Sequence, residues 1–323
     1  MRTRKLGYSD LHLTTIGLGT WAMGGGGWAF GWGPQDDAET IAAIQRALEL
    51  GINWIDTAAV YGVGHSEEMV GKAIAGRRAE VIIATKCGRV WNPGETRPFG
   101  RLKADSVRRE AEASLRRLGV EVIDLYQIHR PDPDEDVEEG WGTIADLIRE
   151  GKVRYGGVSN FNVAQLKRAQ AIYPVASLQP PYSMLRREAE AELLGYCAAN
   201  NIGVVAYSPM QAGLLTGQFS RGRVARLPEN DWRRRNSLFQ EPQLSANLDL
   251  VENLRPIAER NGRTLAQLAI AWVLRRPEVT AAIVGARRPA QIEETAPAAD
   301  WTLAAADIAE IDALLAKREE SLG

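Results

Sequence analysis

Eight short apolar runs, separated by longer amphipathic stretches, constrain the fold of this 323-residue chain more than any other feature. The runs are nearly continuous in Val, Ile and Ala, which is typical of parallel strands that are covered on both faces. Strands that alternate with helices indicate either a doubly wound sheet or a (β/α)8 barrel. The predicted strands span residues 14–20, 53–58, 81–86, 122–129, 153–159, 175–179, 203–208 and 280–286.

The stretches between these runs carry helix signals. Residues 36–51 begin with acidic side chains and end at Gly51, and residues 103–119 place apolar side chains at helical spacing before Gly119. Further helices are expected over residues 137–150, 163–171, 189–200, 289–296 and near 305–318, with an extra pair over 246–261 and 264–275 before the eighth strand.

Two segments depart from this alternation. Residues 1–13 are expected to form a short hairpin that plugs the floor of a barrel. Residues 208–245 form a long strand-free stretch after the seventh strand, and loops of that length are usually functional lids or disordered segments. No linker of low complexity interrupts the chain, so we expect one domain over residues 1–323.

Composition excludes several classes of protein. The chain has 45% hydrophobic and 25% charged residues, which is ordinary for a soluble globular protein. Its net charge of -2 provides no basic field for nucleic acid or an anionic membrane, and no apolar run approaches a membrane span. The N-terminus lacks the apolar region of a secretory signal, and two cysteines suit a reducing compartment. We therefore expect a cytoplasmic protein with no nucleic-acid or membrane partner; the sequence does not predict its oligomeric state.

Four polar side chains are the strongest functional signal. Asp56, Lys86 and His129 follow successive apolar runs, and Tyr61 lies five residues after Asp56. The exits of parallel strands meet at one end of a barrel, so these side chains are expected to converge. A Lys ammonium favours the ionised form of a nearby Tyr, and a carboxylate keeps that Lys protonated. With His129 aiming a carbonyl, the set is typical of carbonyl reduction with Tyr61 as general acid, although each residue alone could cap a strand end.

A rival cofactor motif occurs at residues 17–22, where GLGTWA satisfies the dinucleotide-binding pattern G-x-G-x-x-G/A. That pattern requires a helix to begin at once, whereas MGGGGWAFGWGP follows here, so we interpret the match as accidental. The segment 21–33 is either a flexible connection or, as we favour, the wall of a substrate pocket. The aromatic side chains expected in that pocket are Trp21, Trp28, Trp32 and Trp91, with Phe30 in the same segment.

Other catalytic classes lack their parts. The chain has no G-x-S-x-G elbow, no P-loop and only three widely spaced histidines, so no metal site is expected. Cys87, beside Lys86, is expected to be a small buried hydrophobe rather than a redox-sensitive thiol. The run Arg233–Arg235 is expected to be solvated loop rather than a ligand contact.

Ordered motifs along the whole chain resemble those of the aldo-keto reductases. They are GLGTWAMGG (17–25), DTAAVYG (56–62), SE (66–67), TK (85–86), YQIH (126–129), GKVRYGGVSNF (151–161), AYSPMQAGLLTG (206–217) and IVGARRPAQIEE (283–294). The nearest branch is similar to the bacterial general stress protein and the sugar- or inositol-linked reductases. The resemblance implies a single (β/α)8 TIM barrel, NADP(H) across the carboxyl ends of the strands, no metal, and a small-molecule carbonyl or alcohol substrate.

The resemblance also implies residue roles. Tyr61 would be the general acid and base, Lys86 and Asp56 its tuning pair, and His129 the residue that orients the carbonyl. Ser159, Asn160 and Gln179 would clamp the nicotinamide carboxamide, Tyr207 would stack on its ring, and the segments from 208 and from 285 would hold the pyrophosphate and the adenosine end. The remaining implied cofactor contacts are Gly19, Thr20, Trp21, Asp56, Ser208, Pro209, Met210, Gly213, Leu214, Gly285, Arg287, Arg288, Gln291 and Glu294.

Three positions depart from the family pattern. Pro180 stands where a β-branched residue is usual, Arg287 where a small polar residue is frequent, and Thr295 where Asn is frequent. The adjacent Arg287 and Arg288 suit a phosphate dianion, because Arg offers a bidentate fork, so NADPH is expected over NADH. The alternative is a solvated basic helix end.

Two functional classes stay open at this point. One is an NADP(H)-dependent oxidoreductase, and the other is a cofactor-binding regulatory subunit similar to the potassium-channel auxiliary subunits, which share the fold and resemble the family at the four residues. The chain shows no N-terminal inactivating extension, which favours the enzyme.

Overall fold

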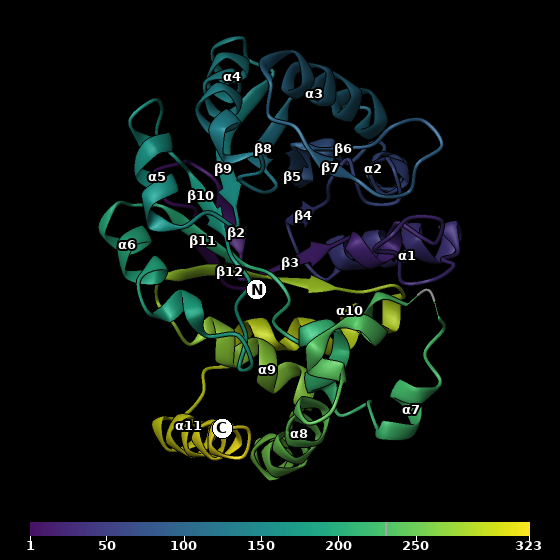
Figure 1. Cartoon of the computed structure of the whole chain (residues 1–323), viewed down its shortest axis with the longest axis vertical. Helices are drawn as coiled ribbons and strands as arrows, with labels where there is room; N and C mark the ends of the chain where they lie inside the picture. Colours follow the sequence, from purple (N-terminus) through teal and green to yellow (C-terminus); the bar gives the residue numbers. More distant parts are fainter. Residues whose placement is uncertain (230) are drawn as a thin grey trace.

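The computed structural model describes residues 1–229 and 231–323 and confirms the predicted (β/α)8 barrel. Eight parallel strands close in the order β10-β11-β12-β3-β4-β5-β8-β9, and helices surround them (Figure 1). All eight predicted strands are present, shorter than or equal to their expected spans or shifted by one residue. They are β3 (Ile16–Gly19), β4 (Trp54–Asp56), β5 (Ile82–Cys87), β8 (Ile123–Ile128), β9 (Val153–Ser159), β10 (Ser177–Gln179), β11 (Gly203–Ala206) and β12 (Val279–Gly285).

The helices follow the strands in sequence and cover the outside of the barrel (Figure 1). They are α1 (Asp37–Glu49), α2 (His65–Ala73), α3 (Ala104–Leu118), α4 (Val137–Arg149), α5 (Val163–Gln170), α6 (Leu193–Ala199), α7 (Arg221–Ala225), α8 (Gln243–Arg260), α9 (Leu265–Leu274), α10 (Pro289–Thr295) and α11 (Ala305–Glu320). Helix α2 and the small hairpin of β6 (Arg89–Val90) and β7 (Phe99–Gly100) were not expected. The two strands are too short to show a hydrophobic period, and α2 begins after Gly64, which has no capping side chain.

Local signals set several helix boundaries. The side chain of Asp36 accepts a hydrogen bond from the Glu39 N–H at the start of α1, which satisfies a donor that has no partner inside the helix. Capping boxes at Asn162 and Thr264 start α5 and α9. Helix α3 ends at Gly119, whose φ of 66° is the left-handed conformation that glycine adopts at little cost.

The N-terminal hairpin closes the floor of the barrel, as expected. Strands β1 (Thr3–Lys5) and β2 (His12–Thr14) pair antiparallel, and the hairpin buries Leu6, Leu11 and Leu13 against inward-facing side chains of the barrel strands. The indole N–H of Trp54 donates to the Thr14 carbonyl over 2.9 Å, which ties the hairpin to the barrel interior. The hairpin therefore packs against the lower barrel interior mainly through apolar side chains.

The segment between β11 and α8 contains no strand in its described residues, but it is not without structure. It holds α7 and the 3-10 turns Gln211–Thr216, Trp232–Arg235 and Ser237–Phe239. Residue 230, which falls in the predicted loop 208–245, lies outside the described residues. Further 3-10 turns occur at Trp21–Met23, Arg78–Glu80, Asp134–Asp136, Glu188–Glu190 and Ala296–Asp300.

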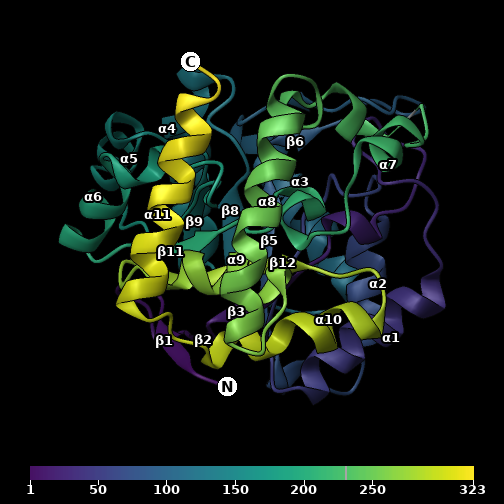
Figure 2. The same cartoon turned by 90° about the horizontal axis from the view of Figure 1, so that it is seen from below.

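The C-terminal helix α11 packs alongside α8 on the outer side of the barrel (Figures 1 and 2). Figure 2 shows the two helices running next to each other over the length of α8. Among the helices of residues 1–229 and 231–323, none is long and apolar enough to cross a membrane.

We expect Leu13→Ala to lower the free energy of unfolding by about 2 to 5 kcal/mol, because Leu13 is almost completely buried and its loss leaves a cavity in the floor. Urea unfolding followed by circular dichroism measures the change. Ile172→Ala is the matched control, since Ile172 is exposed and should cost less than about 0.5 kcal/mol. Equal costs for the two variants would contradict a floor sealed by the hairpin.

Candidate active site

A cavity of about 810 Å³ lies at the carboxyl ends of the barrel strands. This is the end of a (β/α)8 barrel at which the loops after successive strands bring functional side chains together. Most of the predicted site residues line it. They are Gly19, Trp21, Trp28, Trp32, Asp56, Tyr61, His129, Ser159, Asn160, Gln179, Tyr207, Ser208, Pro209, Met210, Gly213, Gly285, Arg287, Gln291 and Glu294.

The remaining predicted residues lie elsewhere. Lys86 is buried directly behind Tyr61, and Thr20 is buried with its hydroxyl bonded to Ser66 and the Asp56 carbonyl. Leu214 is fully buried in a small apolar cluster with Phe219 and Phe239. Trp91 packs against the cluster that contains Trp28. Arg288 is a mostly exposed side chain that lies outside the cavity lining. For Leu214 and Trp91, direct contact with a ligand is not supported by their position.

The ammonium of Lys86 is the electrostatic centre of the site. Its side chain is completely buried, and Nζ donates to Asp56 Oδ1 over 2.6 Å, to the Thr57 carbonyl over 2.8 Å and to Tyr61 Oη over 3.3 Å. Burial alone would lower the pKa of Lys86, but attraction to Asp56 and Tyr61 outweighs it, so the pKa lies above its ordinary value. The three donors of the ammonium are all used, and Lys86 stays charged.

Tyr61 lies on the turn after β4, between Lys86 and the cavity. Its N–H donates to the Ala58 carbonyl over 3.1 Å, and Gly62 follows with a φ of 62°. A Cβ on Gly62 would lie 2.1 Å from the Gly24 carbonyl oxygen, so only glycine fits this turn. Because Lys86 donates to the Tyr61 oxygen, the hydroxyl hydrogen of Tyr61 is left for a ligand on the cavity side.

The pKa of Tyr61 departs from the simplest expectation. The sequence predicts that Lys86 lowers it, and the ammonium does act in that direction. Burial has the larger effect, however, and raises the pKa of Tyr61 above its ordinary value, because a phenolate is poorly solvated there. Tyr61 is therefore held as a protonated phenol at neutral pH.

Two buried glutamines complete the coordination of Asp56. Gln179 Nε2 donates to Asp56 Oδ2 over 2.8 Å, and Gln127 Nε2 approaches the same oxygen at 3.4 Å. Gln179 also donates to Gln127 Oε1 over 3.2 Å, so the two amides support each other. The role of Gln127 was missed at the sequence level, although a glutamine in the middle of the apolar run 122–129 is a visible signal.

His129 faces the same cavity from the end of β8. Its ring lies edge-on to the Tyr61 ring with centroids 5.8 Å apart. Burial, reinforced by the charges of Lys86, Arg130 and Arg89, holds the pKa of His129 well below its ordinary value, so the imidazole is neutral. Its Nδ1 is buried and has no hydrogen-bond partner among residues 1–229 and 231–323, so we assign the proton of the neutral ring to Nε2. His129 can then donate one hydrogen bond into the cavity.

A second polar group lies across the cavity at the ends of β9, β10 and β11. The Tyr207 hydroxyl donates to Asn160 Oδ1 over 2.8 Å, and Asn160 Nδ2 donates to the His129 carbonyl over 3.0 Å and to Ser159 Oγ over 2.9 Å. Ser159 Oγ donates in turn to the Gln179 carbonyl over 2.9 Å. Asn160 has a φ of 63°, a conformation that Asn tolerates better than most residues. The predicted carboxamide clamp is thus one connected network.

The far end of the cavity has room and charge that suit a dinucleotide. Gly285 lines the cavity, and the only described atom within 4 Å of a Cβ built there is the Gly19 carbonyl oxygen at 4.0 Å. Internal packing therefore does not require glycine at 285, whereas a side chain would take up cavity space. Five arginines line the cavity against two carboxylates, Asp56 and Glu294, and Asp56 is neutralised by Lys86. The residues present fit an elongated anionic group.

Arg287 and Arg288 are placed differently. The Arg287 guanidinium bonds to Gln35 Oε1 over 2.5 Å and to the carbonyls of Trp32 and Pro34, which ties the segment 32–35 to the start of α10. Arg288 has 69% of its side chain exposed, and its one ion pair with the residues that the structure describes is a 3.4 Å contact with Glu39. Of the pair predicted to hold a phosphate, Arg288 is the one whose cation is free to bind.

Two loops meet above the cavity through aromatic contacts. The indoles of Trp21 and Trp232 stack with centroids 5.1 Å apart, and Trp32 packs edge-on against both. The Arg233 guanidinium lies 4.7 Å from the Trp32 ring and pairs with the buried Asp231 over 2.6 Å. The sequence predicted a pocket wall in segment 21–33, and it missed the contribution of Trp232.

The expectation that the run Arg233–Arg235 is solvated was wrong for one member. Arg233 lines the cavity with 14% of its side chain exposed, whereas Arg234 and Arg235 are exposed. The reason is the buried carboxylate of Asp231 two residues earlier, which pairs with the first arginine of the run and leaves the other two in solvent.

A partly buried carboxylate, that of Glu110, lies behind the end of β5. Glu110 on α3 accepts a hydrogen bond from the Gly88 N–H over 2.9 Å and one from the Ser106 hydroxyl over 3.1 Å. Burial raises the pKa of Glu110 to about 7. Burial also raises the pKa of Cys87 well above its ordinary value, so this thiol is an inert buried group, as expected.

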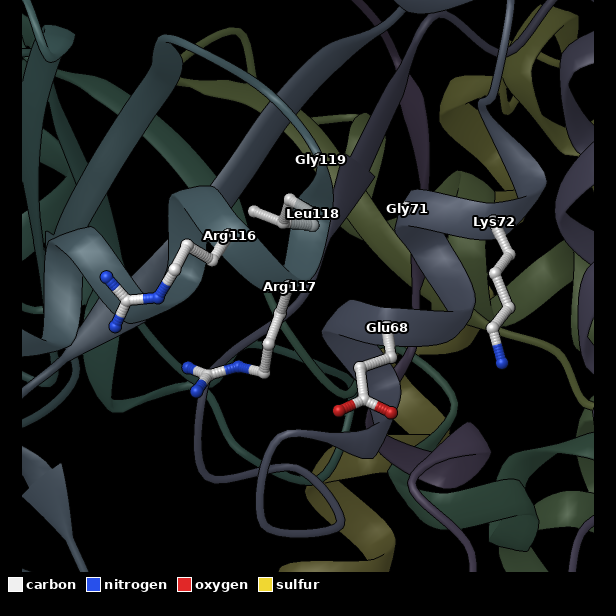
Figure 3. Close-up of a pocket in the computed structure, with 7 residues that line it drawn as sticks. All are labelled: Glu68, Gly71, Lys72, Arg116, Arg117, Leu118 and Gly119. Atoms are coloured by element: carbon white, nitrogen blue, oxygen red, sulfur yellow. The ribbon is translucent and has the colours of Figure 1, made fainter.

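A second hollow lies between α2 and the end of α3, away from the barrel axis. It is lined by Glu68, Gly71, Lys72 and residues 116–119, and Figure 3 shows its charged side chains extending in different directions rather than toward one point. Arg117 there pairs with the buried Glu67 over 2.7 Å and so has a structural partner. Within residues 1–229 and 231–323, no group of three or more His, Cys, Asp or Glu could hold a metal ion.

Comparisons with known proteins agree with this geometry. The model of the Aldo/keto reductase family matches residues 15–316. The chain is similar to aldo-keto reductase YhdN of Bacillus subtilis (strain 168), with 38% identity over 95% of this chain and 91% of the relative. It is also similar to an NADH-specific methylglyoxal reductase of Escherichia coli (strain K12), with 35% identity over 95% and 96% of the two chains.

A solved structure is similar over nearly the whole chain. The glycerol dehydrogenase AKR11B4 from Gluconobacter oxydans matches with a TM-score of 0.89 and 37% identity, covering 98% of this chain and 95% of that one. The similarity therefore includes the barrel, the N-terminal hairpin and the segments that form the cavity.

We expect Glu110→Gln to change how stability depends on pH. The unfolded chain releases the Glu110 proton near 4.5, whereas the folded protein holds it to about 7, so wild-type stability falls as pH rises through this window. The glutamine cannot ionise, so from pH 5 to pH 8 the variant should gain about 2 to 3 kcal/mol relative to wild type. Urea unfolding across that range measures the difference. Glu112→Gln, on the exposed side of the same helix, is the control, and parallel profiles for all three proteins would show that Glu110 is not buried as a neutral acid.

Proposed function

Because the chain belongs to the aldo/keto reductase family, we propose that it interconverts an aldehyde, ketone or sugar carbonyl and the corresponding alcohol with NADP(H), using Tyr61 as the general acid and base. One observation carries this proposal. The Tyr61 hydroxyl and the His129 ring face one cavity, while the buried Lys86 ammonium bonds to the Tyr61 oxygen from behind. That arrangement leaves two hydrogen-bond donors for a single carbonyl oxygen.

The protein's part in the reaction is proton transfer and orientation. A nicotinamide cofactor, when bound, supplies the hydride in reduction and accepts it in oxidation. In reduction, the neutral His129 orients the carbonyl oxygen by donating a hydrogen bond, and Tyr61 gives its proton to that oxygen. In oxidation, Tyr61 removes the proton of the alcohol.

Lys86 and Asp56 make the proton transfer reversible. Burial raises the pKa of Tyr61 and keeps it protonated, and Lys86 limits the cost of the phenolate that forms once the proton has left. Asp56 keeps Lys86 charged, and Gln179 and Gln127 hold the second oxygen of Asp56. Lys86, Asp56 and the glutamines therefore position and tune Tyr61 without contacting the substrate, except where Asp56 reaches the cavity wall.

The cofactor contacts follow from the connected network across the cavity. Ser159, Asn160 and Gln179 offer amide and hydroxyl groups to a carboxamide, and Tyr207 offers a ring face next to them. Ser208 and Gly213 line the same cavity and are assigned to the pyrophosphate, and Gly285, Arg287, Gln291 and Glu294 line it and are assigned to the adenosine end.

The preference for NADP(H) is part of the proposal. Family members differ in this respect, since one similar relative is named an NADH-specific reductase. Here Arg288 is an exposed cation at the start of α10, next to the cavity's far end, and it suits an added 2′-phosphate. The alternative function, a regulatory subunit, is not favoured, because the similar proteins are named reductases and a dehydrogenase.

We expect Tyr61→Phe to lower kcat for aldehyde reduction by about two to four orders of magnitude while leaving NADPH binding within about threefold, because only the proton donor is removed. Steady-state turnover with a panel of aromatic aldehydes and aldoses, together with NADPH fluorescence titration, measures both quantities. Tyr173→Phe is the control, since this tyrosine lies after α5 and does not line the cavity. Unchanged turnover in Tyr61→Phe would sink the assigned mechanism.

The two arginines before α10 should behave differently when changed singly. Arg288→Ala is expected to raise the Kd for NADPH about tenfold and to leave the Kd for NADH unchanged, because it removes a phosphate partner. Arg287→Ala is expected to weaken both cofactors to a similar extent, because it releases the segment 32–35. Fluorescence titration with NADPH and with NADH measures the Kd values. Equal increases in Kd for the two cofactors in Arg288→Ala would rule out the phosphate role.

A further inference from the structure

Two arginines stand on the rim of the cavity that also holds Tyr61 and His129. Arg89 follows β5, and Arg130 follows β8 as the residue after His129, and both line the cavity. Arg89 lies on β6, three residues after Lys86, and Arg130 directly follows His129, so both come from the segments that carry the reacting side of the site. The proposed mechanism gives neither of them a role.

The two arginines differ in how their charges are compensated. Arg89 donates to Asp132 Oδ2 over 2.7 Å and to the Pro98 carbonyl over 3.4 Å. The exposed Arg130 side chain makes no hydrogen bond, ion pair or cation-π contact with any residue of 1–229 or 231–323. Two positive charges and one negative charge therefore leave this rim with one uncompensated cation, and Arg130 carries it.

Arg130 is also separated from the arginines that suit the cofactor. Arg223, Arg233 and Arg287 line the cavity from the segment after β11 and from the start of α10, where the proposed pyrophosphate and adenosine contacts lie. The charge of Arg130 contributes instead to the low pKa of His129 and opposes the rise in the pKa of Tyr207 that burial causes. Its field therefore acts at the reacting end of the cavity.

We propose that Arg130, assisted by Arg89, is a specificity-determining residue that binds an anionic group, a carboxylate or a phosphate, on the carbonyl substrate. The inference rests on the proposed function and narrows its substrate class from carbonyl compounds in general to anionic ones. A guanidinium offers parallel N–H donors that match both anions, and the adjacent His129 fixes the carbonyl of the same molecule. Trp28, whose ring lies 6.2 Å from that of Tyr61, adds an apolar surface to the same cavity.

The test compares matched pairs of aldehydes that differ in charge. Glyceraldehyde and glyceraldehyde 3-phosphate probe the phosphate arm, and benzaldehyde and 4-carboxybenzaldehyde probe the carboxylate arm. We expect Arg130→Gln to lower kcat/KM for the charged member about tenfold or more, mainly through KM, and to change the neutral member less than twofold. Arg130→Lys should keep part of the preference, and the Kd for NADPH should stay unchanged in both variants. Arg149→Gln, an exposed arginine on α4, is the control.

Salt gives an independent measurement. Raising ionic strength should reduce the charged-to-neutral ratio of kcat/KM in wild type but not in Arg130→Gln, because screening acts on the same charge pair. If both aldehydes turn over and Arg130→Gln leaves the charged-to-neutral ratio of kcat/KM unchanged, the anion-binding role of Arg130 is wrong, and the proposed function is unaffected. An increased Kd for NADPH in Arg130→Gln would assign the arginine to the cofactor instead and would also overturn it. Wild type that reduces no member of either pair would count against the proposed function itself.

Discussion

The burial of one ammonium group inside the barrel is the constraint on which the site depends. A lysine that loses all its water is stable only if its charge is paired and its donors are satisfied. The structure meets that demand at Lys86 with the carboxylate of Asp56, the carbonyl of Thr57 and the hydroxyl of Tyr61. Each of these partners is thereby fixed in place. The geometry around Tyr61 therefore follows from the cost of a buried charge as much as from the chemistry that it serves.

The period of a β-strand explains how one barrel holds both a dry floor and a polar site. Side chains two residues apart on a strand face the same side. Trp54 on β4 and Leu125 on β8 point inward at the level of the N-terminal hairpin, and their inward-facing successors are Asp56 and Gln127. Lys86 takes the same upper level on β5. On these three strands, one step of two residues changes the barrel interior from apolar side chains to a hydrogen-bonded network, and the apolar side chains lie beneath the charges.

The features fixed by the barrel strands could be predicted from the sequence, and the contacts made by loops could not. The eight strands and the convergence of Asp56, Lys86 and His129 could be predicted, because the carboxyl ends of the strands in a barrel meet at one end for any loop conformation. The role of Gln127 was missed because a glutamine among apolar residues does not reveal its partner. Helix α2 was missed because its N-cap residue, Gly64, has no side chain that could cap the helix. The burial of Arg233 depends on Asp231 and on rings of a distant loop, and no local pattern encodes that contact.

The residues proposed for the chemistry and those proposed for specificity lie on different parts of the barrel. The residues proposed to move a proton lie on strands or on the turn directly after one, where the barrel fixes their positions. The residues that would distinguish cofactors and substrates, such as Arg288 and Arg130, follow strand ends or begin a helix, where side chains can change without disturbing the core. Similar proteins named a methylglyoxal reductase and a glycerol dehydrogenase share the family or the barrel with this chain. Family membership therefore transfers the reaction type, whereas the ligands must be argued from the charges on the rim of this particular cavity.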